Sequence, residues 1–170
     1  MLHPIYHNMA IESNDTPCLQ QTVPLLAHLL AITQQLQHNN IIGWIPKCYN
    51  DSENLPGEMS DDLKDYIKSH APQLNQIWVS CWQEKDNRTI IEYPWSRGLP
   101  ADYYPFMNDD GYLSPLVAVR FTPPVNEFVY IRCRAWAKNV VYSKSLKEPS
   151  GYIRIQLYVE DLTNITTTEL

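Results

Sequence analysis

The sequence predicts a single α+β domain over residues 1–162, with two helices in the first half packed on a mainly antiparallel sheet of about five strands. Three observations lead to this fold class. Apolar residues of the first half recur at helical spacing, those of the second half alternate with a period of two, and 170 residues suit one ordinary domain. Residues 163–170 are polar and rich in threonine, so we expect a frayed tail.

Two segments of the first half have helical patterns. Over residues 23–38, leucine and isoleucine recur on one face, and Pro24 stands where the first turn of a helix tolerates proline. Because this segment carries no charged residue, we expect it to be covered on both sides. Ser60 followed by two aspartates predicts a second helix over residues 61–70, since carboxylates are favourable at a helix N-terminus.

The strands are predicted by alternation and by the turn residues between them. Residues 77–83 and 89–93 are expected to pair as a hairpin. The following loop, residues 94–115, is so aromatic that we expect it to be ordered by its own packing or by a partner. Further strands are expected at 116–121, 127–142 and 151–160, the last two forming a long C-terminal hairpin.

The two strands of this C-terminal hairpin sort their side chains by parity. Val129, Ile131, Ile155 and Leu157 share an apolar face, on which we expect the first helix to pack. The opposite face is aromatic and basic, and a simple pairing of the strands places Tyr158 beside Trp136. The net charge of the chain is −6, although this region is basic, so an acidic surface argues against coating of duplex nucleic acid.

The aromatic and basic face predicts protein binding, because tyrosine, tryptophan and arginine are enriched at the energetic centres of interfaces. We therefore predict a non-enzymatic interaction module that binds another protein or a second copy of itself: a subunit of a phage or secretion assembly, or an immunity or adaptor protein. We expect Arg134 and Trp136 to contribute to binding more than to stability. The predicted interface residues are Phe128, Tyr130, Arg132, Arg134, Trp136, Lys138, Tyr152, Arg154 and Tyr158, with Trp95, Tyr103, Tyr104 and Phe106 of the long loop.

Three alternatives use the same residues or a thiol. The aromatic and basic face could bind single-stranded nucleic acid by stacking, although the sequence has no RNP-type octapeptide. It could also be ordinary sheet covering, with arginine stems lying on rings. A thiol-dependent enzyme would rest on Cys48, the one cysteine expected to be exposed. No phosphate-binding or hydrolase motif is present, a metal site at His3 and His7 is disfavoured, and we predict no cofactor.

The cellular location is predicted from the cysteines and the lack of targeting signals. Four cysteines without C-x-x-C spacing predict free thiols, and no stretch reaches the roughly 18–20 apolar residues of a membrane span. With no basic segment before an apolar one at the N-terminus, we expect a soluble cytoplasmic protein. The sequons Asn87-Arg88-Thr89 and Asn164-Ile165-Thr166 matter only in a secretory pathway and carry no weight in this prediction.

Overall fold

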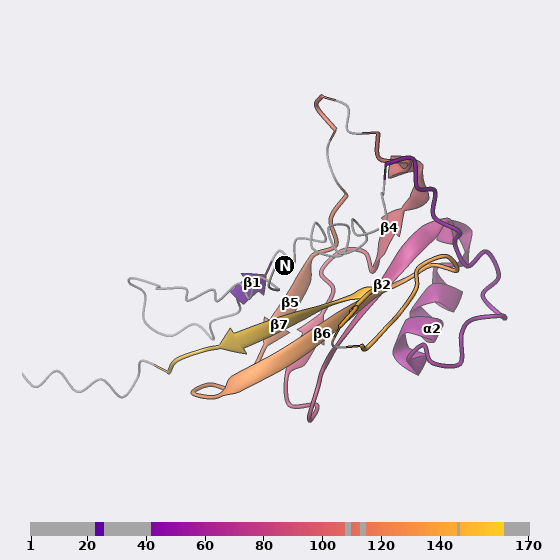
Figure 1. Ribbon diagram of the computed structural model, residues 1–170. Helices are drawn as coiled ribbons and strands as arrows, with labels where there is room; N and C mark the ends of the chain where they lie inside the picture. Colours follow the sequence, from indigo (N-terminus) through magenta and orange to yellow (C-terminus); the bar gives the residue numbers. More distant parts are fainter. Residues whose placement is uncertain (1–22, 26–41, 108–109, 113–114, 146, 162–170) are drawn as a thin grey trace, which may run out of the picture.

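The computed structural model describes residues 23–25, 42–107, 110–112, 115–145 and 147–161 (Figure 1). These residues form a small, mostly β structure with two antiparallel sheets and one α-helix. The smaller sheet has the order β1-β5-β3 and the larger one β4-β2-β6-β7. The strands are β1 (Val23–Leu25), β2 (Gln76–Gln83), β3 (Ile90–Glu92), β4 (Gly98–Pro100), β5 (Val119–Thr122), β6 (Phe128–Trp136) and β7 (Tyr152–Tyr158).

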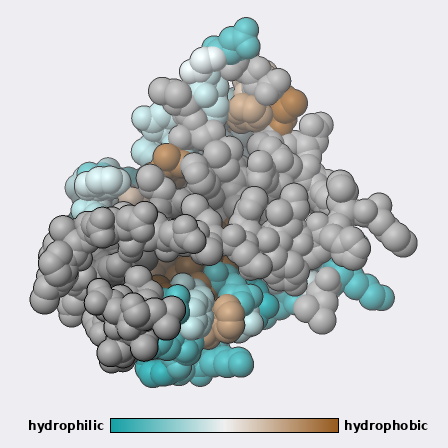
Figure 2. Space-filling view, turned by 90° about the vertical axis from the view of Figure 1, so that its left-hand side faces the viewer, coloured by the Kyte–Doolittle hydropathy of each residue, from teal (hydrophilic) through white to brown (hydrophobic). Residues whose placement is uncertain are grey.

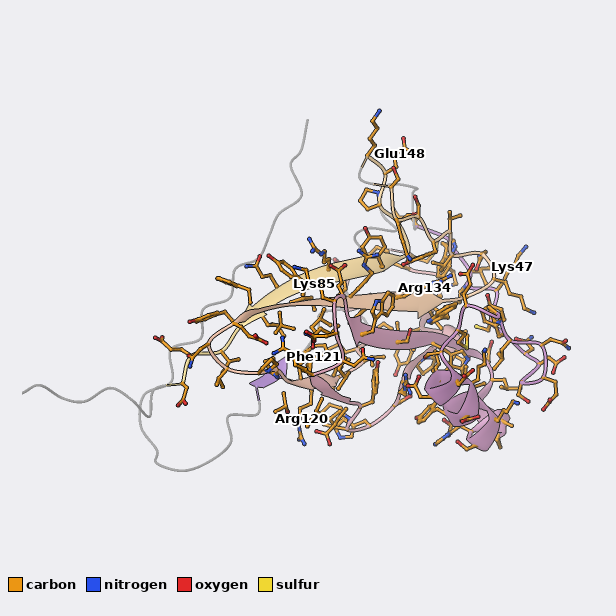
Figure 3. The ribbon with its side chains drawn as sticks, turned by 90° about the horizontal axis from the view of Figure 1, so that it is seen from below. Lys47, Lys85, Arg120, Phe121, Arg134 and Glu148 are labelled. Carbon is orange, nitrogen blue, oxygen red and sulfur yellow. A yellow bond between two sulfur atoms is a disulfide. The ribbon has the colours of Figure 1, made fainter. Side chains whose placement is uncertain are left out.

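The main core lies between the two sheets. Val129, Ile131 and Cys133 of β6 are almost fully buried there, as the parity of this strand predicted. They pack in one cluster with Val119 and Phe121 of β5, and Figure 3 places Phe121 between β5 and the larger sheet. The apolar face of the C-terminal hairpin is therefore covered by a second sheet.

The single described helix, α2 (Asp61–Ser69), packs on the other face of the larger sheet (Figure 1). Its buried residues Leu63 and Ile67 form a second cluster with Met59, Trp78 and Trp136. The prediction of a helix at residues 61–70 is confirmed, with two aspartates in its first turn and a lysine in its last. Because α2 covers part of the face predicted to be an open interface, that face is partly core.

The predicted first helix differs from the structure where the two can be compared. Residues Val23–Leu25 form β1, an edge strand paired with β5, and residues 26–38 lie outside the described residues. An edge strand tolerates Pro24 as well as a first helical turn does, so proline could not separate the two structures. The smaller sheet occupies the face on which we expected this helix to pack.

Two strand pairings also differ from those predicted. Strands β2 and β3 do not pair: β3 pairs with β5, so the chain crosses from the larger sheet to the smaller one after Gln83. In the C-terminal hairpin Tyr158 lies opposite Phe128 and Tyr152 opposite Arg134, so Trp136 is not beside Tyr158. Alternation fixes which face a side chain takes but leaves even shifts of register open.

Candidate binding face of the larger sheet

The aromatic and basic face of β6 and β7 is a ladder of arginines stacked on rings. Residues of even number share this face because side chains alternate along a strand. We call the set Tyr130, Arg132, Arg134, Trp136, Tyr142, Tyr152 and Arg154 the arginine ladder. The guanidinium carbon of Arg154 lies 4.3 Å from the centre of the Tyr130 ring, that of Arg132 lies 4.4 Å from Tyr152, and that of Arg134 lies 3.6 Å from Trp136 and 3.9 Å from Tyr142.

Glu84 compensates the charge at the centre of the arginine ladder. Arg132 and Arg154 are directly opposite each other in the sheet, a like-charged pair that repels. The carboxylate of Glu84 bridges them, 2.5 Å from Arg132 and 2.8 Å from Arg154. Burial raises the pKa of Glu84, but the hydrogen bonds and charges of both arginines outweigh it and hold this pKa below its ordinary value.

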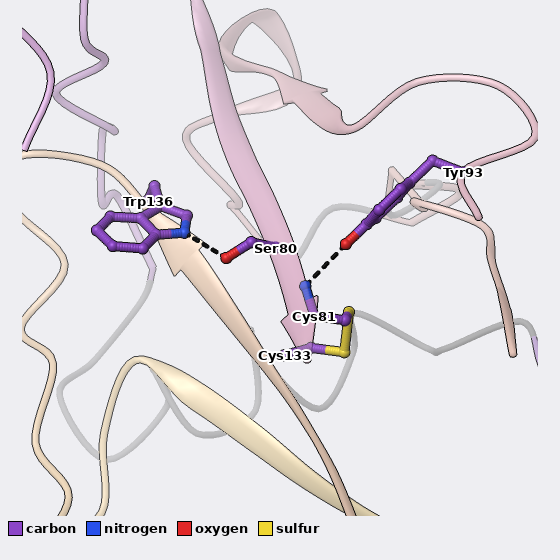
Figure 4. The surroundings of a disulfide bond; sticks show 5 residues. All are labelled: Ser80, Cys81, Tyr93, Cys133 and Trp136. Atoms are coloured by element: carbon purple, nitrogen blue, oxygen red, sulfur yellow. Dashed lines mark hydrogen bonds between the residues drawn. A yellow bond between two sulfur atoms is a disulfide. The ribbon is translucent and has the colours of Figure 1, made fainter. Parts of the chain in front are cut away.

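Trp136 and Arg134 are held by contacts within the chain. The Trp136 ring is 3% exposed, and its Nε1–H donates to Ser80 Oγ at 2.8 Å (Figure 4). Arg134 forms an ion pair of 3.0 Å with Glu58. The expectation that these two residues matter more for binding than for stability is therefore wrong for Trp136, since little of its surface remains for a partner.

An open groove of about 570 Å³ lies beside this end of the ladder. Exposed carboxylates of Glu58 and Asp62, together with Lys144, line it alongside the arginine ladder. The described residues contain no group of three histidine, cysteine or acidic side chains that could hold a metal ion. The groove therefore offers charged and aromatic contacts and lacks a donor set for metal chemistry.

Four of the predicted interface residues are exposed aromatic side chains. Phe128 and Tyr158 are 63% and 46% exposed, with ring centres 4.9 Å apart. In the long loop Trp95, before β4, is 79% exposed and Tyr103, after β4, is 49% exposed. Within the arginine ladder Trp136 and Tyr152 are buried, whereas Arg154 is exposed.

The other predicted interface residues take intermediate positions. Tyr104 packs edge to face on Trp44 with ring centres 5.6 Å apart, and burial raises its pKa to about 12. Phe106 packs against Tyr112 in the same loop. Lys138 is exposed, with its ammonium 5.8 Å from the Tyr49 ring. Tyr104 and Phe106 are thus held by aromatic contacts within the chain, one outside the loop and one inside it.

A disulfide joins Cys81 of β2 to Cys133 of β6 (Figure 4). The two residues are register partners on the core side of the sheet, with Cα atoms 4.0 Å apart. Tyr93 Oη accepts a hydrogen bond of 2.7 Å from the Cys81 N–H. The prediction of free thiols is wrong for this pair. Both cysteines were predicted to lie on the apolar faces of strands, and this shared placement was the sequence signal for a disulfide.

The remaining described thiol is not a reactive one. Cys48 is 5% exposed, and burial raises the pKa of its thiol, which keeps it protonated and a poor nucleophile. The expectation that Cys48 is exposed is therefore wrong. The structural disulfide indicates folding in an oxidising compartment, where such bonds persist, whereas the cytoplasm keeps thiols reduced.

Comparison with known proteins identifies a family. Residues 35–155 match the family model of the sodium / potassium ATPase beta chain. The chain is 43% identical over 131 residues to the sodium/potassium-transporting ATPase subunit beta-1 of Drosophila melanogaster, and 41% identical over 134 residues to subunit beta-2 of the same fly. Each alignment covers 74% of this chain and 41% of the relative. A probable beta-3 subunit of Caenorhabditis briggsae is 30% identical over 72% of this chain and 36% of the relative.

These matches correct the functional predictions. Subunits of an ion-transporting ATPase act at a membrane, so a cytoplasmic location and a soluble phage, secretion, immunity or adaptor role are wrong. The nucleic-acid and thiol-enzyme alternatives are wrong for the same reason. No helix in the described part of the chain is long and apolar enough to cross a bilayer. The chain spans about two fifths of the length of these relatives, and the match over residues 35–155 shows that it belongs to the sodium/potassium ATPase beta chain family.

Proposed function

We propose that this chain is part of a non-catalytic subunit of a sodium/potassium-transporting ATPase and that it binds the ATP-hydrolysing subunit of that enzyme. The observation that carries this proposal is the family match over residues 35–155, which includes β2 to β6 and the first half of β7. The buried thiol of Cys48 supports a non-catalytic role.

The exposed end of the long loop is the surface that we assign to the partner subunit. Brown apolar surface is exposed near the top of Figure 2, the end at which Figure 1 draws the loop after β4. Trp95 and Tyr103 are the exposed aromatic residues of residues 94–115, and Met107 and Leu116 are exposed apolar residues nearby in sequence. Large aromatic side chains supply contact area at low entropic cost when their backbone is already ordered.

The base of this loop is fixed by Arg97, which supports the assignment. The buried guanidinium of Arg97 lies 4.2 Å from the centre of the Tyr93 ring and forms an ion pair of 2.9 Å with Asp62 of α2. The next residues, Gly98–Pro100, form β4 and pair with the start of β2. Trp95 is therefore held between two anchored segments, and a partner would not have to order it.

Co-expression of the full-length protein with an ATP-hydrolysing subunit tests this function. We expect the two to co-purify, and we expect Trp95→Ala to weaken their association tenfold or more, about 1.4 kcal/mol. Phe128→Ala is the matched control, because Phe128 is an exposed aromatic residue outside this loop. Equal association of both variants would place the partner elsewhere, and no association of the unmodified protein would overturn the proposed function.

A further inference from the structure

An open pocket of about 460 Å³ lies beside β4, which is an edge strand of the larger sheet. Its volume is in the range typical of ligand-binding sites, roughly 300–1,000 Å³. Ser96, which follows the exposed Trp95, lines it, so the pocket adjoins the loop that we assign to the partner subunit. The lining residues are Gln73, Gln76, Ser96, Gly98, Pro100, Tyr103, Pro115 and Leu116.

The wall of this pocket contains a buried hydrogen-bond acceptor without a donor. Gln76 is 8% exposed, and its Nε2 donates to Gln73 Oε1 at 3.4 Å. The Gln76 Oε1 is buried and has no hydrogen-bond partner in the described part of the chain. A Cβ at position 98 would collide with this amide, so Gly98 leaves the space that the amide occupies. A buried carbonyl oxygen without a donor destabilises the fold, and a ligand that supplies a donor removes this cost.

The free edge of β4 is closed to a further strand. Arg97 and Ala101 bond through their backbones to β2 and to the residue before it, so the backbone groups of Gly98 and Pro100 face away from β2. The Gly98 N–H donates to Ser96 Oγ at 3.1 Å, and the Ser96 hydroxyl donates to Gly98 O at 3.3 Å. Pro100 has no N–H. Because this edge offers an added strand no free N–H, we expect the occupant of the pocket to enter as a side chain.

The lining residues favour a neutral donor on an apolar body. None of the described residues that line the pocket is charged, so a lysine or arginine would lose its hydration there without gaining a counter-ion. Tyr103 and Leu116 are about half exposed and can cover a ring. Tryptophan and tyrosine combine a large apolar ring with one neutral N–H or O–H, and both are enriched at protein interfaces.

We propose that this pocket receives one tryptophan or tyrosine side chain of the ATP-hydrolysing subunit, whose ring N–H or O–H donates a hydrogen bond to Gln76 Oε1. This inference rests on the proposed binding of that subunit. The ring packs against Tyr103 and Leu116, which are exposed when the chain is alone. The buried acceptor, which destabilises the chain alone, then stabilises the complex.

Removal of the acceptor tests the pocket in the full-length protein co-expressed with an ATP-hydrolysing subunit. Gln76→Leu keeps a side chain of similar size without the Oε1, and we expect it to associate roughly three- to tenfold more weakly. Gln156→Leu is the matched control, because Gln156 lies on β7 at the other edge of the larger sheet, and it should associate normally. Equal association of Gln76→Leu and the unmodified protein would overturn the pocket alone. No association of the unmodified protein would overturn the proposed function itself.

A photo-reactive benzophenone amino acid in place of the exposed Leu116 identifies the occupant. This experiment leaves Gln76 unchanged, so it tests the pocket even where Gln76→Leu folds poorly. We expect a cross-link to the ATP-hydrolysing subunit at or next to a tryptophan or tyrosine. Replacement of that residue by phenylalanine keeps a ring and removes the donor, so its effect on association and that of Gln76→Leu should not add. Additive effects, a cross-link to a second copy of this chain, or no cross-link in assembled complexes would overturn the proposal.

Discussion

The Cys81–Cys133 disulfide is expected to be a large part of the stability of this fold. The bond closes a loop with a sequence separation of 52 residues. In the chain-entropy model, a loop of this length stabilises the folded state by about 4 kcal/mol. We therefore expect Cys81→Ala combined with Cys133→Ala to lower the free energy of unfolding by about that amount, a large fraction of the roughly 5–15 kcal/mol typical of a domain.

Urea denaturation followed by tryptophan fluorescence measures this loss. With a slope of about 2 kcal/mol per molar urea, the midpoint should fall by roughly 2 M. Cys48→Ala is the control, because it removes a buried thiol without opening a disulfide. The unmodified protein in reductant should approach the midpoint of the double variant. A double variant within about 1 kcal/mol of the unmodified protein would refute the reasoning.

Three further predictions follow from individual contacts. Trp136→Ala should lower the free energy of unfolding by about 3–5 kcal/mol because Trp136 is buried. Trp95→Ala should change the free energy of unfolding by less than about 0.5 kcal/mol because Trp95 is exposed. Denaturant titration compares the two variants. Two arginines hold the pKa of Glu84 in the folded protein below its ordinary value of 4.5 despite burial. The ionised Glu84 therefore stabilises the fold fully above pH 4.5, and this stabilisation is lost as the pH falls through the lower pKa of the folded state. Glu84→Gln should make the free energy of unfolding less dependent on pH in a profile measured from about pH 6 to 3. Gly151→Ala should lower the melting temperature, since φ is +73° and the new Cβ would lie 2.6 Å from Val141 O, whereas Gly57→Ala meets nothing within 4 Å and should leave it nearly unchanged.

Local sequence patterns predicted which strand face is buried and where the helix begins, because both depend on residues that are close together in the sequence. The alternation around Val129 and Ile131 identified the buried face of β6, and the aspartates after Ser60 identified the start of α2. The pairing of β3 with β5 was not predictable in this way, because alternation is the same whichever sheet a strand joins. The single-domain organisation of residues 1–162 stays a prediction.

The sequence predicted the composition of the candidate binding face but not the contacts within it. The alternation of side chains placed the arginines and aromatic residues on one face. It could not show that the guanidinium groups would stack on the rings of the same chain. Residue composition is similar for an interface and for a self-contained ladder, and only the register that sets Arg132 opposite Arg154, with Glu84 between them, separates the two. The register of β2 with β6 places Cys81 opposite Cys133, and the sequence alone did not predict this register.

The most direct test of the proposed function is purification of the endogenous protein from native membranes in mild detergent, followed by native mass spectrometry and an assay of ATP hydrolysis. We expect a stoichiometric larger subunit in the same complex, and hydrolysis that requires both sodium and potassium. Recovery of this chain alone, or with partners that have no such activity, would contradict the proposal that it is part of a transporting ATPase.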